Sequence, residues 1–196
     1  MKVNEKKTNY LIITRSNYKF ATRLGIKNTT LDLVHESKII GVWLTSNLKW
    51  DKNTKELTKK AYARMSMLTK LKYVGTSTKD LLETYILFIR NALEYCSVLW
   101  HSSLTVEQEK SLERVQKVCL KIILSDNYVS YEVALELSNL ETLSKRREQR
   151  CLCFAKKCLK HPIHKNLFPR NTNNLNNEYS SSEIFSVNHA RTETYR

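Results

Sequence analysis

From Asp51 onward, apolar residues recur at helical spacing with almost nothing to interrupt them. Leu57, Ala61, Met65 and Leu68 are spaced by four, four and three residues, which places them on one face of a helix. The chain has 196 residues, of which only 3 are Gly and 2 are Pro, so the backbone contains few helix breakers. The sequence therefore predicts a mostly helical protein.

Several further helices are predicted downstream of this first one. Gly75 ends the first helix, and Ser77 or Thr78 begins the next, which runs from about residue 79 to residue 100. Three more are expected: from Thr105 through Ile123, over residues 131–137, and over residues 143–160 before Pro162. Glu113 and Lys117 lie four residues apart, which favours an ion pair on the helix surface.

The helix at residues 79–100 is nearly apolar all round, so we expect it to lie in the middle of the bundle. The side chains predicted to cover most of its circumference are Leu81, Leu82, Tyr85, Ile86, Phe88, Ile89, Leu93, Cys96 and Trp100. A membrane span is excluded, because Glu83, Arg90 and Glu94 would each be costly within a bilayer.

The first 50 residues have a different pattern, in which short β-branched runs alternate with polar breaks. Residues 9–14 form one such run, and residues 24–44 hold several more, so we expect short antiparallel strands joined by turns. The predicted fold class is α+β, mostly α. Its expected parts are a strand region at residues 1–50, a helical bundle of four to five helices at residues 51–164, and a flexible polar tail at residues 165–196.

The net charge of +14 is concentrated at the two ends of the chain. Residues 1–75 carry 16 basic and 5 acidic side chains, whereas residues 76–141 carry 6 basic and 10 acidic ones. A basic face of this size attracts polyphosphate, so nucleic acid is the first partner to consider and an anionic membrane surface the second. A basic protein without such a partner is the alternative.

The expected nucleic-acid contacts lie on the first helix. They are Lys52, Lys55, Lys59, Lys60, Lys70 and Lys72. The alternative for these lysines is an ordinary solvated helix face. Tyr10, Tyr18, Phe20, Trp43 and Trp50 stand among basic residues and could stack on bases, but core packing is favoured for Trp43 and is equally consistent with Trp50.

Specific segments occur in an order that resembles a known family. They include IIGVWLTSNLKW at residues 39–50, LEYC at residues 93–96 followed by Trp100, and SLERVQKVCLKIIL at residues 111–124. Together they resemble the C-terminal part of reverse transcriptases from jockey-like non-LTR retrotransposons, and the similarity runs through nearly the whole chain. The resemblance implies the end of a polymerase palm followed by a thumb.

In the resembled enzymes, the segment matching residues 39–50 is a hairpin that supports the primer end. The resemblance therefore implies primer-grip-like roles for Ile40, Gly41, Val42, Leu48 and Trp50. Gly41 also has a physical interpretation, because a missing side chain in a hairpin lets another backbone approach closely. The expected partner is a template–primer of RNA or DNA, with no membrane and no small-molecule substrate.

Polymerase chemistry needs paired carboxylates that hold two metal ions, and the family places them upstream of the matched region. The four Asp of this chain (Asp32, Asp51, Asp80 and Asp126) are not adjacent to one another. We therefore expect no catalytic residue and no cofactor in this chain, with Mg²⁺ needed only by a complete polymerase. Thr45, Asn53 and Thr54 replace residues usual in the family, which indicates a fragment or a decaying copy.

Five cysteines and an N-terminus without an apolar leader favour reduced thiols in an intracellular compartment, with nucleus and cytoplasm left open. Cys151, Cys153, Cys158, His161 and His164 are zinc-ligand types, but two thiols two residues apart on a helix point in different directions. Small core cysteines are the favoured interpretation. The alternative function is a helical protein-interaction or structural module that does not bind nucleic acid.

Overall fold

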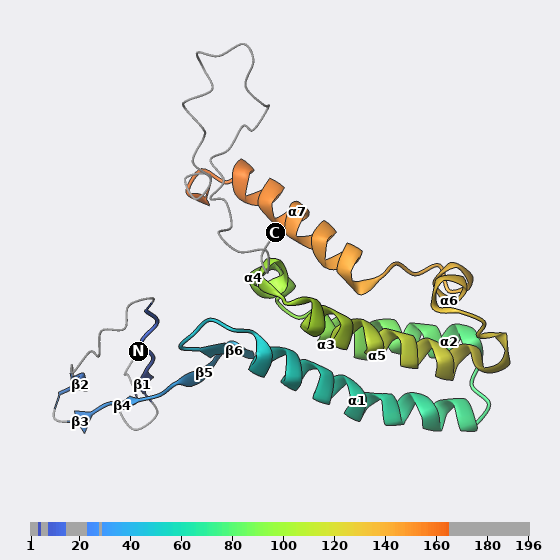
Figure 1. The fold of residues 1–196 in the computed structure, drawn as a ribbon, viewed down its shortest axis with the longest axis horizontal. Helices are drawn as coiled ribbons and strands as arrows, with labels where there is room; N and C mark the ends of the chain where they lie inside the picture. The colour runs from blue at the N-terminus through green and yellow to red at the C-terminus, as the bar shows by residue number, and fades with distance from the viewer. Residues whose placement is uncertain (1–3, 5–7, 15–22, 28, 165–196) are drawn as a thin grey trace, which may run out of the picture.

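The computed structural model describes residues 4, 8–14, 23–27 and 29–164, and it is mostly helical with short strands near the N-terminus (Figure 1). This arrangement confirms the expected class, α+β and mostly α. The predicted polar tail at residues 165–196 lies outside the described residues, as do Tyr18 and Phe20.

Short strands precede the first helix and pair two by two. They are β1 (Asn9–Tyr10), β2 (Gly25–Ile26), β3 (Thr29–Thr30), β4 (Asp32–Leu33), β5 (Glu36–Ile39) and β6 (Val42–Thr45). The pairs β2–β3 and β5–β6 are antiparallel, as predicted. The pair β1–β4 is parallel, so the antiparallel prediction is wrong there, and only two residues of the run at 9–14 form a strand.

The helical part begins directly after the β5–β6 hairpin. The α-helices are α1 (Asp51–Tyr73), α2 (Thr78–Thr84), α3 (Asn91–Leu93), α4 (Ser97–Trp100), α5 (Val106–Leu124), α6 (Tyr131–Leu137) and α7 (Leu143–Lys160). Between them lie the π-helix η2 (Tyr85–Arg90) and two 3₁₀ turns, η3 (His101–Ser103) and η4 (Ser125–Asn127).

Hydroxyl side chains begin the helices where the sequence predicts them. Ser77 accepts a hydrogen bond from the backbone N–H of Asp80, and Thr105 forms a reciprocal capping box with Gln108. After α1 the chain turns at Gly75, whose φ of +87° is the left-handed conformation that glycine adopts most easily.

The predicted single helix at residues 79–100 is instead interrupted twice. The first interruption is the π-helix η2 itself. The second is at Cys96, between α3 and α4, which has a left-handed φ of 51°. The second break is stabilised by Trp100, which is fully buried and whose indole N–H donates to the carbonyl of Tyr95 at 3.0 Å. This hydrogen bond supplies a partner for the Tyr95 carbonyl at the helix break, and it places the Trp100 ring in the core.

The core lies between α1, the α2–η2–α3 segment and α5, as the apolar stripes predict. Leu81, Tyr85, Ile89 and Leu93 are all fully buried. These residues are four apart in sequence, and the π-helix, which has more residues per turn than an α-helix, keeps their side chains on one face. The prediction for Phe88 is wrong, because its side chain is 52% exposed.

A polar network crosses the core at Gln116, which is fully buried. Its amide accepts from the hydroxyl of Tyr85 and donates to that of Tyr131 at 2.8 Å. Tyr131 in turn donates to Glu113, which also accepts from the backbone N–H of Leu143 at the start of α7. Glu113 is therefore occupied, and no Glu113–Lys117 ion pair forms among the described residues; the predicted surface pair is wrong.

Candidate nucleic-acid interface

The β5–β6 hairpin turns through two residues, Ile40 and Gly41, with φ values of 47° and 84°. Two positive φ angles define the turn whose twist matches paired strands. A β-branched residue rarely adopts this conformation. Ile40 does so while 84% exposed, so the hairpin tip presents an apolar side chain to solvent.

The hairpin tip is held by Tyr95, which precedes the break between α3 and α4. The hydroxyl of Tyr95 donates to the carbonyl of Ile40 at 2.9 Å. A Cβ built on Gly41 would lie 3.1 Å from Cε1 of the same ring. The prediction that Gly41 permits a close approach is confirmed, but the approaching group is an aromatic side chain and not a backbone.

The five primer-grip-like positions divide by exposure. Val42 and Trp50 are buried in the core, whereas Ile40 and Leu48 are exposed. Gly41, at the turn, is also exposed. The structure therefore leaves Ile40 and Leu48 accessible to a partner, while Val42 and Trp50 hold the hairpin onto the bundle.

The structure places Trp43 and Trp50 in different surroundings. Trp50 is a core residue, whereas Trp43 is half-buried. The ring of Trp43 lies beneath Lys52 and Lys38, whose ammonium groups are 4.9 and 5.8 Å from its centroid. The core-packing interpretation is therefore wrong for Trp43, because its ring is only partly buried and lies against two lysine side chains.

Two of the three departures from the resembled pattern have structural roles here. Asn53 is buried, and its side-chain oxygen accepts from the backbone N–H of Trp43 at 3.2 Å. Thr45 donates its hydroxyl to the carbonyl of Lys49 at 2.9 Å and closes the loop before α1. These two side chains join the hairpin to the first turn of α1. Thr54 is buried, but its hydroxyl has no hydrogen-bond partner among the described residues.

The six lysines predicted to bind nucleic acid also divide into two groups. Lys52 forms an ion pair with Glu36 at 3.2 Å, and Lys72 donates to the carbonyl of Ile123 at 3.0 Å, so both stabilise the fold. The other four lie exposed on α1, with no ion pair to any described residue. They are Lys55, Lys59, Lys60 and Lys70.

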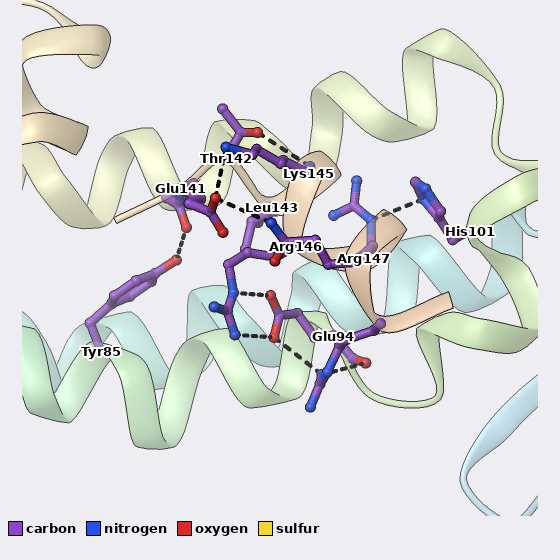
Figure 2. A network of polar contacts seen from close by, with 12 residues as sticks. Tyr85, Glu94, His101, Glu141, Thr142, Leu143, Lys145, Arg146 and Arg147 are labelled. Carbon is purple, nitrogen blue, oxygen red and sulfur yellow. Dashed lines mark hydrogen bonds and ion pairs between the residues drawn. The ribbon is translucent and has the colours of Figure 1, made fainter. Parts of the chain in front are cut away.

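The arginines of α7 form an internal clamp that sequence reasoning missed. Glu94 is only 1% exposed, and its carboxylate pairs with Arg146 at 2.8 Å and with Arg150 at 3.1 Å (Figure 2). Arg147 is fully buried and donates to Nδ1 of His101 at 3.5 Å. The clamp joins α7 to the α3–α4 break.

Two surface grooves lie on either side of Tyr95. The α1 groove has a volume of about 310 Å³ and is lined by Gly41, Leu57, Lys60, Arg64, Asn91, Ala92 and Tyr95. The α7 groove has a volume of about 530 Å³ and is lined by Asn91, Glu94, Tyr95, Cys96, Ser97, Val98, Arg150, Cys153, Phe154 and Lys157. Sequence reasoning could not find them, because each is formed by helices distant in the chain.

The cysteines do not converge on a metal site. Within residues 4, 8–14, 23–27 and 29–164, no three His, Cys, Asp or Glu side chains are placed to hold one ion. Burial raises the pKa of the Cys119 thiol to about 12, and it also raises the pKa of Cys151. Buried thiols with raised pKa values are poor nucleophiles.

No helix in the described part of the chain combines the length and the apolar character that a membrane crossing requires. Comparison with protein families, with curated proteins and with solved structures gave no match.

Proposed function

We propose that the chain derives from the reverse transcriptase of a jockey-like non-LTR retrotransposon and binds template–primer nucleic acid through α1. The observation that carries this proposal is the set of four exposed lysines on α1, which follows directly on the β5–β6 hairpin. The sequence resemblance supports the proposed family, and the exposed lysines support nucleic acid as the proposed partner.

The charge on α1 is left largely uncompensated. Asp51 accepts a hydrogen bond from Gln108 at 2.7 Å, and Glu56 is half-buried. The exposed lysines therefore face solvent without acidic partners among the described residues. Neutralising phosphates would release condensed counterions from the nucleic acid, which is a favourable and sequence-independent contribution to binding.

The hairpin supplies a second contact in this proposal. Ile40 lies at its tip, and the Tyr95 hydroxyl holds the Ile40 backbone in place. An apolar side chain at a fixed position can pack against the sugar or base of a primer end. Leu48, 49% exposed, offers a second apolar side chain beyond the other end of β6, just before α1.

Polymerisation itself is not part of the proposed function. The proposal assigns no catalytic carboxylate pair to this chain, because its four Asp are far apart in the sequence. Primer-extension assays with Mg²⁺ or Mn²⁺ should therefore give no incorporation. Extension that is lost on mutating residues of this chain would contradict this part of the proposal.

Fluorescence anisotropy with a labelled primer–template duplex tests the binding proposal. We expect weak binding without sequence preference, and an affinity that falls steeply between about 50 and 200 mM salt. An affinity unaffected by salt, or no binding at low salt, would contradict the proposal and favour the protein-interaction or structural module instead.

A further inference from the structure

The α1 groove and the α7 groove share two lining residues, Asn91 and Tyr95. The two grooves therefore adjoin at Tyr95 and make one trough that runs from α1 across α3 to α7. We call it the Tyr95 trough, and its named residues are Lys60, Arg64, Asn91, Tyr95, Arg150, Phe154 and Lys157.

The charges along the Tyr95 trough are nearly all positive. Lys60 and Arg64 line the end at α1, and Arg150 and Lys157 line the end at α7. The single acidic residue that lines either groove is Glu94, whose carboxylate is buried and already paired with two arginines. An anionic partner therefore meets cations at both ends and no accessible carboxylate between them.

Aromatic rings are interleaved with these cations. Tyr95 is 44% exposed at the centre of the trough, and Phe154 is 50% exposed in its α7 half. Exposed rings set between cations are typical of sites where successive unpaired bases stack while the backbone follows the charges. An acidic peptide would pair with the cations, but its carboxylates would not stack on the aromatic rings.

We infer that the Tyr95 trough binds single-stranded nucleic acid, with a base stacked on Phe154 and backbone phosphates on Lys60, Arg64 and Lys157. This inference rests on the proposed function and extends it, since it gives the unpaired strand a path away from Lys55, Lys59 and Lys70 of α1. Lys60 is the one α1 lysine that the two proposed paths share. The inference also assigns α7 a binding role that the sequence did not indicate.

Neighbouring residues on α7 supply matched controls. Lys156 and Lys157 are both exposed, but only Lys157 lines the α7 groove. Leu152 and Phe154 are likewise both exposed, and only Phe154 lines it. Each pair therefore tests the groove with the same kind of change on the same helix.

The experiment measures anisotropy of a labelled oligothymidylate of about ten nucleotides, with a blunt duplex measured in parallel. Phe154→Ala should weaken single-strand binding by about five-fold or more, and Leu152→Ala should leave it unchanged. Lys157→Gln should lower the slope of log affinity against log salt by about 0.7, and Lys156→Gln should not. Duplex affinity should be the same in all four variants.

A second measurement needs no variant. Cys153 lines the α7 groove and is exposed, so its alkylation by iodoacetamide should be slowed by the oligothymidylate. The inference would be overturned if the two variants of each pair had equal effects, or if the oligothymidylate did not protect Cys153 from alkylation. It would also be overturned if polyglutamate bound the chain and the oligonucleotide did not. If the wild-type chain binds neither duplex nor single strand, the proposed function itself fails; if it binds duplex alone, only the Tyr95 trough is wrong.

Discussion

Tyr95 and Ile40 are 55 residues apart in the sequence, yet the tyrosine hydroxyl donates to the isoleucine carbonyl at 2.9 Å. The bond fixes the tip of the β5–β6 hairpin against the break between α3 and α4. The same ring lies beside Gly41 and lines both the α1 groove and the α7 groove. A single side chain thus joins the strand region to both candidate binding surfaces.

Gly41→Ala should destabilise the protein more than Gly75→Ala. Both glycines have a left-handed φ, so both substitutions carry a backbone cost of about 1–2 kcal/mol. The new methyl group at residue 41 would also lie 3.1 Å from the Tyr95 ring, whereas nothing lies within 4 Å at residue 75. Urea unfolding should show an additional loss of about 1 kcal/mol at residue 41.

The control for this prediction is the double variant Gly41→Ala, Tyr95→Ala, with Tyr95→Ala alone as its reference. Removing the ring should abolish the additional loss, so that Gly41→Ala then costs about as much as Gly75→Ala. Equal losses at the two glycines in the presence of Tyr95 would show that the ring does not constrain the turn.

Ile89→Ala should lower the free energy of unfolding by about 2–5 kcal/mol, because the side chain is fully buried within η2. Leu87→Ala is the matched control, since Leu87 lies on the same helix and is 60% exposed. Its effect should stay within about 0.5 kcal/mol. An unchanged unfolding midpoint for Ile89→Ala would place η2 outside the core.

Glu94→Gln should cost about 3 kcal/mol, because it removes the buried carboxylate that compensates Arg146 and Arg150. The control is Glu141→Gln, which removes the surface ion pair with Lys145. That change should cost much less, because both groups are exposed to solvent. Chemical denaturation measures both, and similar losses would show that the clamp contributes no more than a surface pair.

His101 should make the stability depend on pH. Burial and then the nearby Arg147 cation lower the pKa of this imidazole, while Glu109 and Glu148 oppose the shift. The unfolded chain therefore binds the proton at a higher pH than the folded chain. The contribution of His101 to stability is complete above the usual pKa of about 6.5 and is lost as the pH falls through the lower folded pKa.

Urea unfolding of the wild-type chain and of His101→Gln tests this pH dependence. The wild-type chain should lose stability between about pH 7 and pH 5, and the variant should lose less over the same interval. Parallel pH profiles for the two proteins would show that His101 does not titrate differently on folding.

The helices were predictable because their signals are local. The stripe from Leu57 to Leu68 and the capping hydroxyls of Ser77 and Thr105 depend on residues within a few positions of one another. The β5–β6 turn lacked such a local signal, because it is formed by Ile40 and Gly41 and not by a polar break; only the family resemblance predicted a hairpin there.

The clamp and the grooves could not be predicted, because they depend on contacts between distant residues. Glu94 lies 52 residues before Arg146 and 56 before Arg150. Nothing local in the sequence marks these arginines as partners of a buried carboxylate. Their replacement would damage the fold, so a control for nucleic-acid binding must use exposed lysines that form no ion pair with a described residue.

The most direct measurement is the salt dependence of duplex binding by the variant Lys55→Gln, Lys59→Gln, Lys60→Gln. The matched control replaces Lys79, Lys110 and Lys156, three exposed lysines on α2, α5 and α7 that line neither groove. We expect the slope of log affinity against log salt to fall by about 0.9 for each α1 lysine that contacts a phosphate, and to stay unchanged in the control. Equal slopes for the two triple variants would show that α1 is not the nucleic-acid interface.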